Sequence, residues 1–313
     1  GELPDRSDLD DEWEVVAFRH YNSASNRGNL EYLDLEGREN FEFAWGDLRD
    51  AESVDSAMGE ARYVFHLGAI VAIPYSYVNP RGFVETNVEG TQNVLEAARR
   101  RDDIERVVVT STSEVYGTAQ YVPIDEEHPL QGQSPYSASK IGADHLAESY
   151  YRSFDVPVGI LRPFNTYGPR QSMRAIIPTI ISQLLTRDVV ELGNLSPRRD
   201  LTFVEDTVEG FVRMATEEVP YGEPINIGNG SDISIGELFE LLRDLTGSDA
   251  ELQTDEQRVR PEKSEVMRLL SDPSKAQETI GWEPNHSLEQ GLEKTIAWVR
   301  EHSAGMRADE YHI

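Results

Sequence analysis

Short apolar runs alternate with longer amphipathic stretches along the first half of the chain. Five runs have the length and the β-branched or aromatic content of strands, at residues 14–18, 41–45, 63–69, 106–112 and 156–164. Between them, residues 87–100 and 137–154 carry an apolar stripe at helical spacing. This alternation predicts βαβ units, and therefore an α/β fold built on a doubly wound parallel sheet.

The pattern is less regular after Pro169. It predicts a helix over 175–185, a strand followed by a helix over 201–215, a strand and turn over 225–230, and two further helices over 234–247 and 287–300. We therefore expect a first domain over 1–166 and a smaller second domain over 167–313.

Charge is the most unusual global feature of the sequence. The chain has 57 acidic and 29 basic residues, which gives a net charge of −28. DNA and RNA phosphates repel such a protein, so nucleic acid is not expected as a partner. The acidic residues are scattered rather than gathered in a tail, which favours a solvated acidic shell over a docking surface for a cationic partner. Salt screens the self-repulsion of such a shell, so the composition indicates a halophilic protein.

Other features narrow the class of protein further. The chain has no cysteine, which excludes disulfides, thiolate metal ligands and cysteine nucleophiles. The histidines form no metal-binding pattern, so no metal is expected, and His66 is expected to be structural. No apolar run is as long as a membrane span and no signal-peptide pattern opens the sequence. We therefore expect a cytoplasmic protein without a membrane partner.

Candidate chemistry lies where the fourth predicted strand ends. Thr112, Ser113 and Glu114 follow this strand, and ligands of doubly wound sheets bind beyond the carboxyl ends of the strands. Tyr136 and Lys140 are one turn apart on the next helix, so their side chains share a face. A nearby ammonium lowers the pKa of a phenol, which would make the tyrosine a base toward a substrate hydroxyl. A tyrosine and a lysine at this spacing are also ordinary surface residues.

Several motifs together resemble a known family. The stretch STSEVYGTAQYVPIDEEHPLQGQSPYSASKIGAD (111–144), with RPFNTYGPRQS (162–172) and DEQRVRPEKSEV (255–266), is similar to the extended short-chain dehydrogenase/reductases, the NAD-dependent epimerases and dehydratases. Shorter motifs such as GDLRD (46–50) and NIGNG (226–230) extend the similarity from residue 14 to about 298. Within this family the sequence most resembles the N-acetylglucosamine-nucleotide 4,6-dehydratases of the legionaminic-acid pathway.

The resemblance implies a nucleotide-sugar 4,6-dehydratase. Tyr136 would take the proton of the sugar 4-hydroxyl while hydride passes to a tightly held NAD or NADP, with Thr112 bonded to the same oxygen and Lys140 holding the phenolate and the nicotinamide ribose. Glu114 would remove the C5 proton, water would leave from C6, and the hydride would return to C6. Ser113 stands where deoxythymidine-diphosphoglucose dehydratases carry an aspartic acid, so Glu114 is expected to protonate the leaving hydroxyl as well.

Other functions are compatible with the same resemblance. A 4-epimerase shares the opening oxidation but usually lacks the glutamate, whereas a decarboxylase of nucleotide-glucuronate often has it. A degenerate, non-catalytic nucleotide-sugar-binding protein is a further alternative, because the Gly-rich turn that receives the pyrophosphate of a dinucleotide is absent from the sequence. The strand that should precede that turn, in the middle of the sheet, is absent too.

The resemblance also assigns residues to the cofactor and the substrate. Residues 1–166, with 201–226 returning to them, would form the dinucleotide-binding domain, and 167–313 would mainly bind substrate. The expected cofactor residues, in addition to Tyr136 and Lys140, are Asp47, Leu48, Leu67, Gly68, Ala69, Asn87 and Pro163. The expected substrate residues are Tyr75, Asn165, Arg199 and Arg260. The helices over 80–100 and 137–154 resemble those that pair in family homodimers.

One loop bears on the form of the cofactor. The stretch FRHYNSASNRG (18–28) offers no acidic residue for the ribose 2′-hydroxyl of NAD. Its polar and basic residues could instead meet the 2′-phosphate of NADP, or could simply be solvated; they are Arg19, Asn22, Ser23 and Arg27. The sequence therefore leaves the choice between NAD and NADP open.

Overall fold

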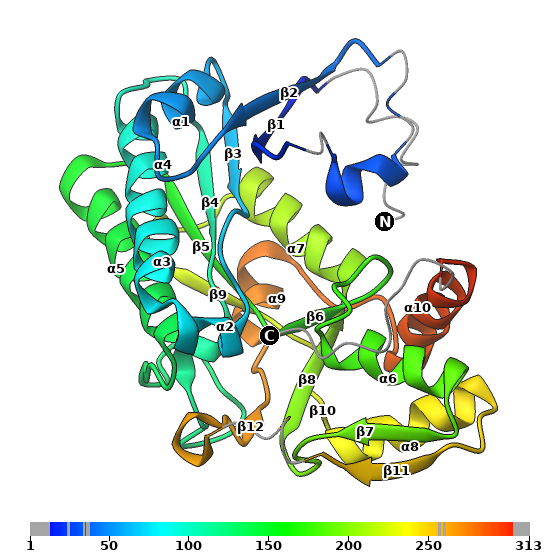
Figure 1. The fold of residues 1–313 in the computed structure, drawn as a ribbon. Helices are drawn as coiled ribbons and strands as arrows, with labels where there is room; N and C mark the ends of the chain where they lie inside the picture. The colour runs from blue at the N-terminus through cyan, green and yellow to red at the C-terminus, as the bar shows by residue number, and fades with distance from the viewer. Residues whose placement is uncertain are drawn as a thin grey trace.

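A computed structural model of the chain describes residues 13–23, 26–33, 35, 38–255, 258 and 261–302 (Figure 1). Its largest sheet is parallel and has the strand order β3-β4-β5-β9. These strands are β3 (Tyr63–His66), β4 (Arg106–Thr110), β5 (Val158–Pro163) and β9 (Pro224–Ile227). The predicted α/β architecture with a parallel sheet is confirmed.

The first two strands form a separate parallel pair. β1 (Val15–His20) lies beside β2 (Phe41–Gly46), with Val15 opposite Phe41. Among the described residues β1 pairs only with β2, and β3 pairs only with β4, so each has one edge without a sheet partner. Apolar side chains near these edges are strongly exposed, with Val16 at 48% and Phe65 at 43%. The described residues therefore contain no strand that joins the two sheets.

Helices cover both faces of the larger sheet. On one face α1 (Ala51–Met58), α4 (Gly90–Arg99) and α5 (Pro135–Phe154) pack on Val107 and Val109. On the other face α7 (Val204–Thr216) and α9 (Ser274–Ile280) pack on Val108. Successive residues of a strand point to opposite faces, so a strand buried on both faces is apolar throughout. This explains the run of valines in β4.

The chain between β3 and α4 is mostly helical. It forms α2 (Ile73–Val78), α3 (Pro80–Phe83) and a π-helical stretch, η2 (Val84–Glu89), that leads directly into α4. The helix predicted over 87–100 therefore begins earlier, because Asn79 caps α3 through a hydrogen bond from the backbone N–H of Gly82 (3.2 Å) and the backbone stays helical from there. Among the described helices, none is both long and apolar enough to cross a membrane.

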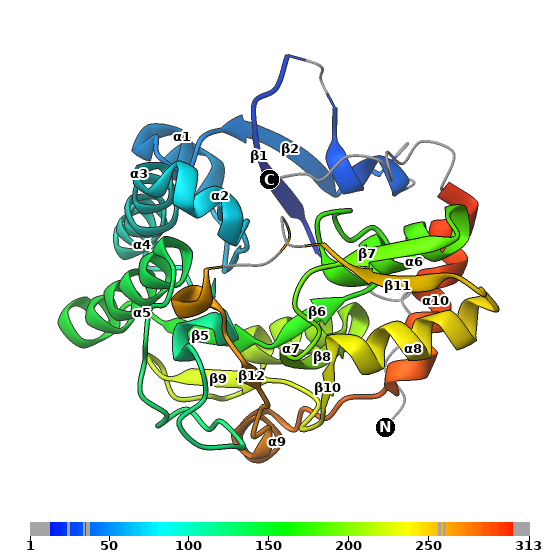
Figure 2. The same cartoon turned by 60° about the horizontal axis from the view of Figure 1, so that its bottom comes forward.

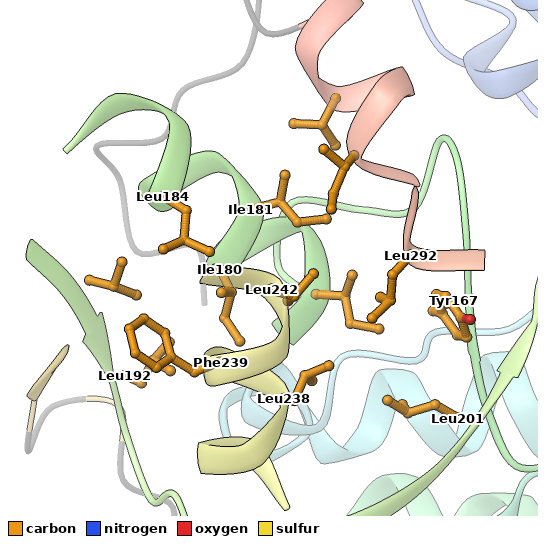
Figure 3. Packing of buried hydrophobic residues seen from close by; sticks show 14 of the residues in the cluster. Tyr167, Ile180, Ile181, Leu184, Leu192, Leu201, Leu238, Phe239, Leu242 and Leu292 are labelled. Atoms are coloured by element: carbon orange, nitrogen blue, oxygen red, sulfur yellow. The ribbon is translucent and has the colours of Figure 1, made fainter. Parts of the chain in front are cut away.

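A second lobe lies on the side of the molecule away from α4 and α5 (Figures 1 and 2). It contains α6 (Ile176–Thr186), α8 (Ile235–Thr246) and α10 (Leu288–His302). Leu238, Phe239 and Leu242 of α8 pack against Ile180 and Ile181 of α6 in its core (Figure 3). The helices predicted over 175–185, 234–247 and 287–300 thus coincide with α6, α8 and α10 to within two residues.

Two small sheets complete this lobe. β7 (Val189–Leu192) pairs with β11 (Glu251–Thr254). β8 (Arg198–Phe203) lies between β10 (Asp232–Ser234) and β12 (Arg268–Leu269), and β6 (Asn165–Tyr167) also pairs with it. Within residues 201–226, α7 and β9 therefore lie on the large sheet, whereas residues 201–203 belong to β8.

Candidate active site

The side chain of Thr112 shapes the end of β4. Its backbone is extended, and its Oγ1 accepts a hydrogen bond from the N–H of Glu114 at 3.2 Å. Threonine oxygens commonly cap the first turn of a helix in this way. The cap starts the 3-10 helix η3 (Ser113–Tyr116), which buries Ser113 and Glu114 directly beyond the strand. The predicted strand end thus becomes a tight turn that brings a carboxylate into the interior.

A second cap positions the tyrosine and the lysine. Ser134 and Ser137 form a reciprocal capping box, with hydrogen bonds of 3.1 and 3.0 Å between side chains and backbone N–H groups. Pro135 occupies the first turn, where its missing N–H is not needed. Helix α5 therefore starts just before Tyr136, and Tyr136 and Lys140 both lie buried on its inner face, with exposures of 7% and 3%.

The environment of Tyr136 differs from the sequence prediction. The ring packs on Ile73 and on Phe83, with ring centroids 6.2 Å apart. Burial raises the pKa of Tyr136 well above its usual value; hydrogen bonding to Thr112 opposes this rise, and the charges of Glu114 and Asp144 add to it. The predicted lowering of the Tyr136 pKa by Lys140 is therefore wrong for this structure. Desolvation of the phenol outweighs the hydrogen bond.

Lys140 is directed toward β4. Its Nζ donates a hydrogen bond to the backbone carbonyl of Thr110, at the end of the strand. Burial lowers the pKa of Lys140, while the negative charge of Asp144 opposes that change. The structure therefore brings together Thr112, Glu114 and Tyr136. Lys140 lies one turn further along α5, with its Nζ at the end of β4.

The residues predicted to line a cofactor groove lie after β2, β3 and β5. Asn87 is buried and clamps the chain after β3, since it accepts a bond from the N–H of Ile70 (2.9 Å) and donates to the Ile70 carbonyl (3.0 Å) and to Ser139 (3.0 Å). A Cβ on Gly68 would stand 2.5 Å from a methyl of Leu48, so the backbone passes close to that side chain. Leu67 and Ala69 flank this glycine, with Leu67 62% exposed, and Pro163 ends β5.

Charged groups surround the end of β2. Asp47 accepts hydrogen bonds from Arg49 and from His20, and hydrogen bonding to Arg49 lowers the pKa of Asp47. Arg19, near the end of β1, lies over the rings of Phe43 and Trp45 at 5.4 and 5.0 Å. Its guanidinium also donates to the carbonyl of Asn26 at 2.6 Å. Arg19 is thus held by aromatic and backbone contacts.

These residues fit one half of a dinucleotide. Tyr136, Lys140 and Thr112 offer a phenol, an ammonium and a hydroxyl beyond β4, which suits a nicotinamide riboside. For the pyrophosphate, the described part of the chain supplies no strand–glycine-rich turn–helix unit, the element that usually binds it. Among the described residues, β1 and β3 each keep one strand edge without a partner.

The residues predicted to bind substrate lie in the second lobe and near α2. The Oδ1 atom of Asn165, in β6, is buried and has no hydrogen-bond partner among the described residues. Arg199, in β8, is 7% exposed, and its guanidinium lies 3.6 Å from the carboxylate of Glu265. Tyr75, in α2, is 36% exposed and packs against Phe83. Arg260 lies outside the described residues.

A buried polar network that was not predicted from the sequence lies next to these groups. Asp144, on α5, bonds to Ser111 and Arg162, and Arg162 bonds to Tyr116 at the end of η3. One signal was present, because Asp144 follows Lys140 by four residues and so shares its helix face. Arg162 was a second signal, since it is the only charged residue in the apolar run 156–164, and arginine is rarely buried unless it is paired.

Comparisons with known proteins identify the family. Residues 8–295 match the family model described as GDP-mannose 4,6 dehydratase. The low-salt glycan biosynthesis protein Agl12 of Haloferax volcanii is 35% identical over 285 residues, which are 90% of this chain and 89% of that protein.

Solved structures extend the likeness to the fold. The dTDP-glucose 4,6-dehydratase DesIV of Streptomyces venezuelae, solved with NAD bound, superposes with a TM-score of 0.86 at 30% identity and covers 96% of this chain and 91% of its own. A UDP-glucuronic acid 4-epimerase variant from Bacillus cereus, also with NAD, gives 0.84 at 27% identity, with 92% and 91% covered. The chain therefore belongs to the GDP-mannose 4,6-dehydratase family, among the nucleotide-sugar dehydratases and epimerases of the extended short-chain dehydrogenase/reductases.

Proposed function

We propose that the protein is a nucleotide-sugar 4,6-dehydratase that forms a 4-keto-6-deoxy sugar. The observation that carries this proposal is the placement of Glu114. The residue is 9% exposed and is the second residue of the turn η3 that Thr112 caps, and its charge raises the pKa of the Tyr136 phenol. Dehydration needs a second base for C5 in addition to the group that deprotonates the 4-hydroxyl, and this site contains both.

In the proposed reaction the chain removes two protons from the sugar and gives two back. Tyr136 accepts the proton of the 4-hydroxyl, and Thr112 hydrogen-bonds the same oxygen. Glu114 takes the C5 proton, which is removable once C4 is a ketone, and gives a proton to the hydroxyl that leaves C6 as water. The proton that Tyr136 took from the 4-hydroxyl ends on C5 as C6 is reduced, so both side chains regain their starting states and the sugar loses one water in total.

We propose NAD as the cofactor, because dehydratase and epimerase structures that superpose on this chain contain it. Bound NAD would accept the hydride from C4 and return it to C6. Lys140 and Tyr136 would hold the nicotinamide ribose, and the Asn87 clamp would fix the backbone that lines the groove. The cationic nicotinamide would also favour the phenolate of Tyr136 and so offset the effect of burial.

The substrate proposed is an N-acetylglucosamine nucleotide, from the resemblance of the 111–144 stretch to dehydratases of that class. Arg199 and Arg260 would bind the diphosphate, because guanidinium groups match phosphate oxygens and the net charge of −28 repels anions elsewhere. The unpartnered Asn165 oxygen would accept a bond from the ligand. Tyr75 would contact the sugar.

Two neighbouring activities are the competing candidates. A 4-epimerase is supported by the superposition on the Bacillus cereus enzyme. Epimerisation needs no base at C5, however, so Glu114 would have no catalytic role in a 4-epimerase. A decarboxylase of nucleotide-glucuronate would begin with the same oxidation. Its product distinguishes it from a dehydratase, because the sugar loses carbon dioxide instead of water.

The mass of the product decides among these functions. The chain, and a version fused to a strand–glycine-rich turn–helix unit, would be incubated with NAD or NADP and with uridine- and guanosine-diphospho-N-acetylglucosamine in high salt. Loss of one water supports the proposal. An unchanged mass with a new stereoisomer would replace it with an epimerase, and loss of carbon dioxide from a glucuronate substrate with a decarboxylase. Substrate binding without any reaction in either version would indicate a non-catalytic binding protein.

Three properties of the whole protein complete the proposal. The charge and the relative in Haloferax volcanii support a halophilic protein. We further propose a homodimer that pairs through the faces of the 80–100 and 137–154 helices, and a cytoplasmic location, where nucleotide sugars are made.

A further inference from the structure

We infer that Asp144, paired with Arg162, is a positioning residue that locks the tyrosine–lysine helix onto the end of β4 and serves as the counter-charge of Lys140. This inference concerns residues outside the proposed catalytic set. Its functional meaning rests on the proposed function, but its physical content does not.

The pair is fully enclosed. Asp144 is 2% exposed and Arg162 is 4% exposed. The Oδ2 atom of Asp144 accepts bonds from Ser111 Oγ (2.8 Å) and from Arg162 Nε (3.1 Å). The Oδ1 atom is buried and has no hydrogen-bond partner among the described residues, so this carboxylate is under-satisfied for its burial.

The contacts of the pair reach each element of the site. Ser111 precedes Thr112 directly at the end of β4, and Asp144 itself is one turn beyond Lys140 on α5. Arg162, on β5, donates to the hydroxyl of Tyr116 (3.0 Å), and this hydroxyl donates to Asn226 (2.7 Å) on β9. Tyr116 ends the 3-10 helix that bears Glu114. One ion pair therefore connects the helix of Tyr136, the strand end of Thr112 and the turn of Glu114.

The charges around Lys140 give Asp144 an electrostatic role. Burial lowers the pKa of His66, on β3, to about 3, so this imidazole is neutral near pH 7 and adds no second positive charge near Lys140. Tyr136 is neutral as well, and Arg162 is itself a cation. Glu114 lies on η3, beside Tyr136. Asp144 is the acidic group whose charge opposes the desolvation of Lys140.

Removing that charge should move two titrations in the same direction. Asp144→Asn keeps the shape and an acceptor oxygen but loses the negative charge, so the ammonium of Lys140 is less favoured and the Lys140 pKa falls. The phenolate of Tyr136 meets less repulsion, so its pKa falls also. Both limbs of a pH–rate profile that depends on these groups therefore shift to lower pH. A merely structural role would reduce activity without such a shift.

The chain permits a direct measurement, because it has only four lysines, Lys140, Lys263, Lys275 and Lys294. Lysine labelled with ¹³C at Cε would be titrated by NMR in the whole chain, with the Lys140 signal assigned by Lys140→Arg. We expect Lys140 to titrate roughly one pH unit or more lower in Asp144→Asn than in the parent protein. The other three lysines should be unchanged. Asp102→Asn removes an equal charge at an exposed position and should leave Lys140 unchanged.

Asp144→Asn leaves the buried guanidinium of Arg162 without its acid, which destabilises the fold. A second variant therefore keeps the inference testable. Asp144→Asn combined with Arg162→Gln removes both charges and should still lower the Lys140 pKa, by less than the single variant because loss of a nearby cation favours the ammonium, whereas Arg162→Gln alone should not lower it. An unchanged Lys140 titration in the folded single or double Asp144 variant overturns the inference. If the titration shifts but the parent protein performs no dehydration, the proposed function is rejected and the role of Asp144 as counter-charge stands.

Discussion

The Oγ1 atom of Thr112 accepts the backbone N–H of Glu114 at 3.2 Å, and the same side chain acts to lower the pKa of Tyr136. One hydroxyl therefore links the two groups to which the proposed reaction assigns proton transfer. It fixes the turn that carries the carboxylate, and it opposes the rise in the pKa of the phenol. A change at Thr112 should disturb both.

Thr112→Val should lower the rate of substrate oxidation by about 100-fold, since a methyl group replaces the hydroxyl at the substrate oxygen. It should also lower the free energy of unfolding by about 1 kcal/mol through loss of the cap. Steady-state kinetics and denaturant unfolding measure the two effects. Thr112→Ser restores the hydroxyl and should recover most of both; equal losses in the serine and valine variants would contradict the assignment.

Glu114→Gln should separate oxidation from dehydration. The amide cannot take the C5 proton, so C4 should still be oxidised while loss of water slows by roughly 100-fold to 10,000-fold. Absorbance at the reduced nicotinamide band reports the first step, and product mass reports the second. Glu127→Gln, at an exposed position in the next loop, is the matched control. Dehydration at the parental rate in Glu114→Gln would show that another group is the base.

Much of this architecture was readable from the sequence, for physical reasons. β4 carries a run of three valines that is buried on both faces, and α5 was predicted from the apolar stripe over 137–154. The pairing of the strands was harder to predict from the sequence. β8 reads as a continuation of the first domain, but it pairs with β6, β10 and β12 through contacts between residues far apart in the chain.

The site was predicted in its parts but not in its energetics. Tyr136 and Lys140 were found from their spacing, yet the direction of the Tyr136 pKa depends on how deeply α2 and α3 cover the ring. Desolvation is a property of the packed fold, so no local pattern reports it. The Asp144–Arg162 pair was missed because its two residues are 18 positions apart, and their contact depends on how α5 packs against β5.

Asp200 should give the protein a measurable pH dependence of stability. It is fully buried in β8 and accepts backbone N–H groups of Asn229 (2.8 Å), Gly230 (2.9 Å) and Ser271 (3.1 Å). Burial raises the pKa of Asp200 to about 7 from 3.8, against the opposing effect of these bonds. The folded state therefore binds the proton more tightly, and its contribution to stability is lost as pH rises from about 4 to about 7.

Asp200→Asn removes this titration. The variant should be less stable at every pH, since its amide donates where the backbone also donates, but its deficit should shrink by roughly 4 kcal/mol between pH 4 and pH 7. Denaturant unfolding of both proteins across this range, in constant salt, measures the difference. A deficit that grows with rising pH would mean that the three N–H groups keep the carboxylate ionised.

Salt should stabilise the protein strongly. The net charge of −28 repels itself, and the Debye length falls from about 10 Å at 0.1 M salt to about 3 Å at 1 M. The midpoint of thermal unfolding should therefore rise by several degrees between these concentrations of potassium chloride. An uncharged osmolyte at equal osmolality is the control, because it screens nothing. An equal rise in both solutions would attribute the effect to water activity rather than to charge.

Helix α5 runs for 20 residues without a break, from the capped start at Ser134 to a left-handed residue at Asp155. At 1.5 Å per residue it is about 30 Å long. Its far end is anchored in the core through Ala147 and Tyr150. Because the helix is continuous, a substitution at Tyr150 that tilts its far end would also displace Tyr136, Lys140 and Asp144 together. Their spacing along the helix would survive, but their distances to Thr110, Ser111 and Arg162 on other elements would change. Remote variants of this kind should therefore lose turnover and also shift its pH dependence.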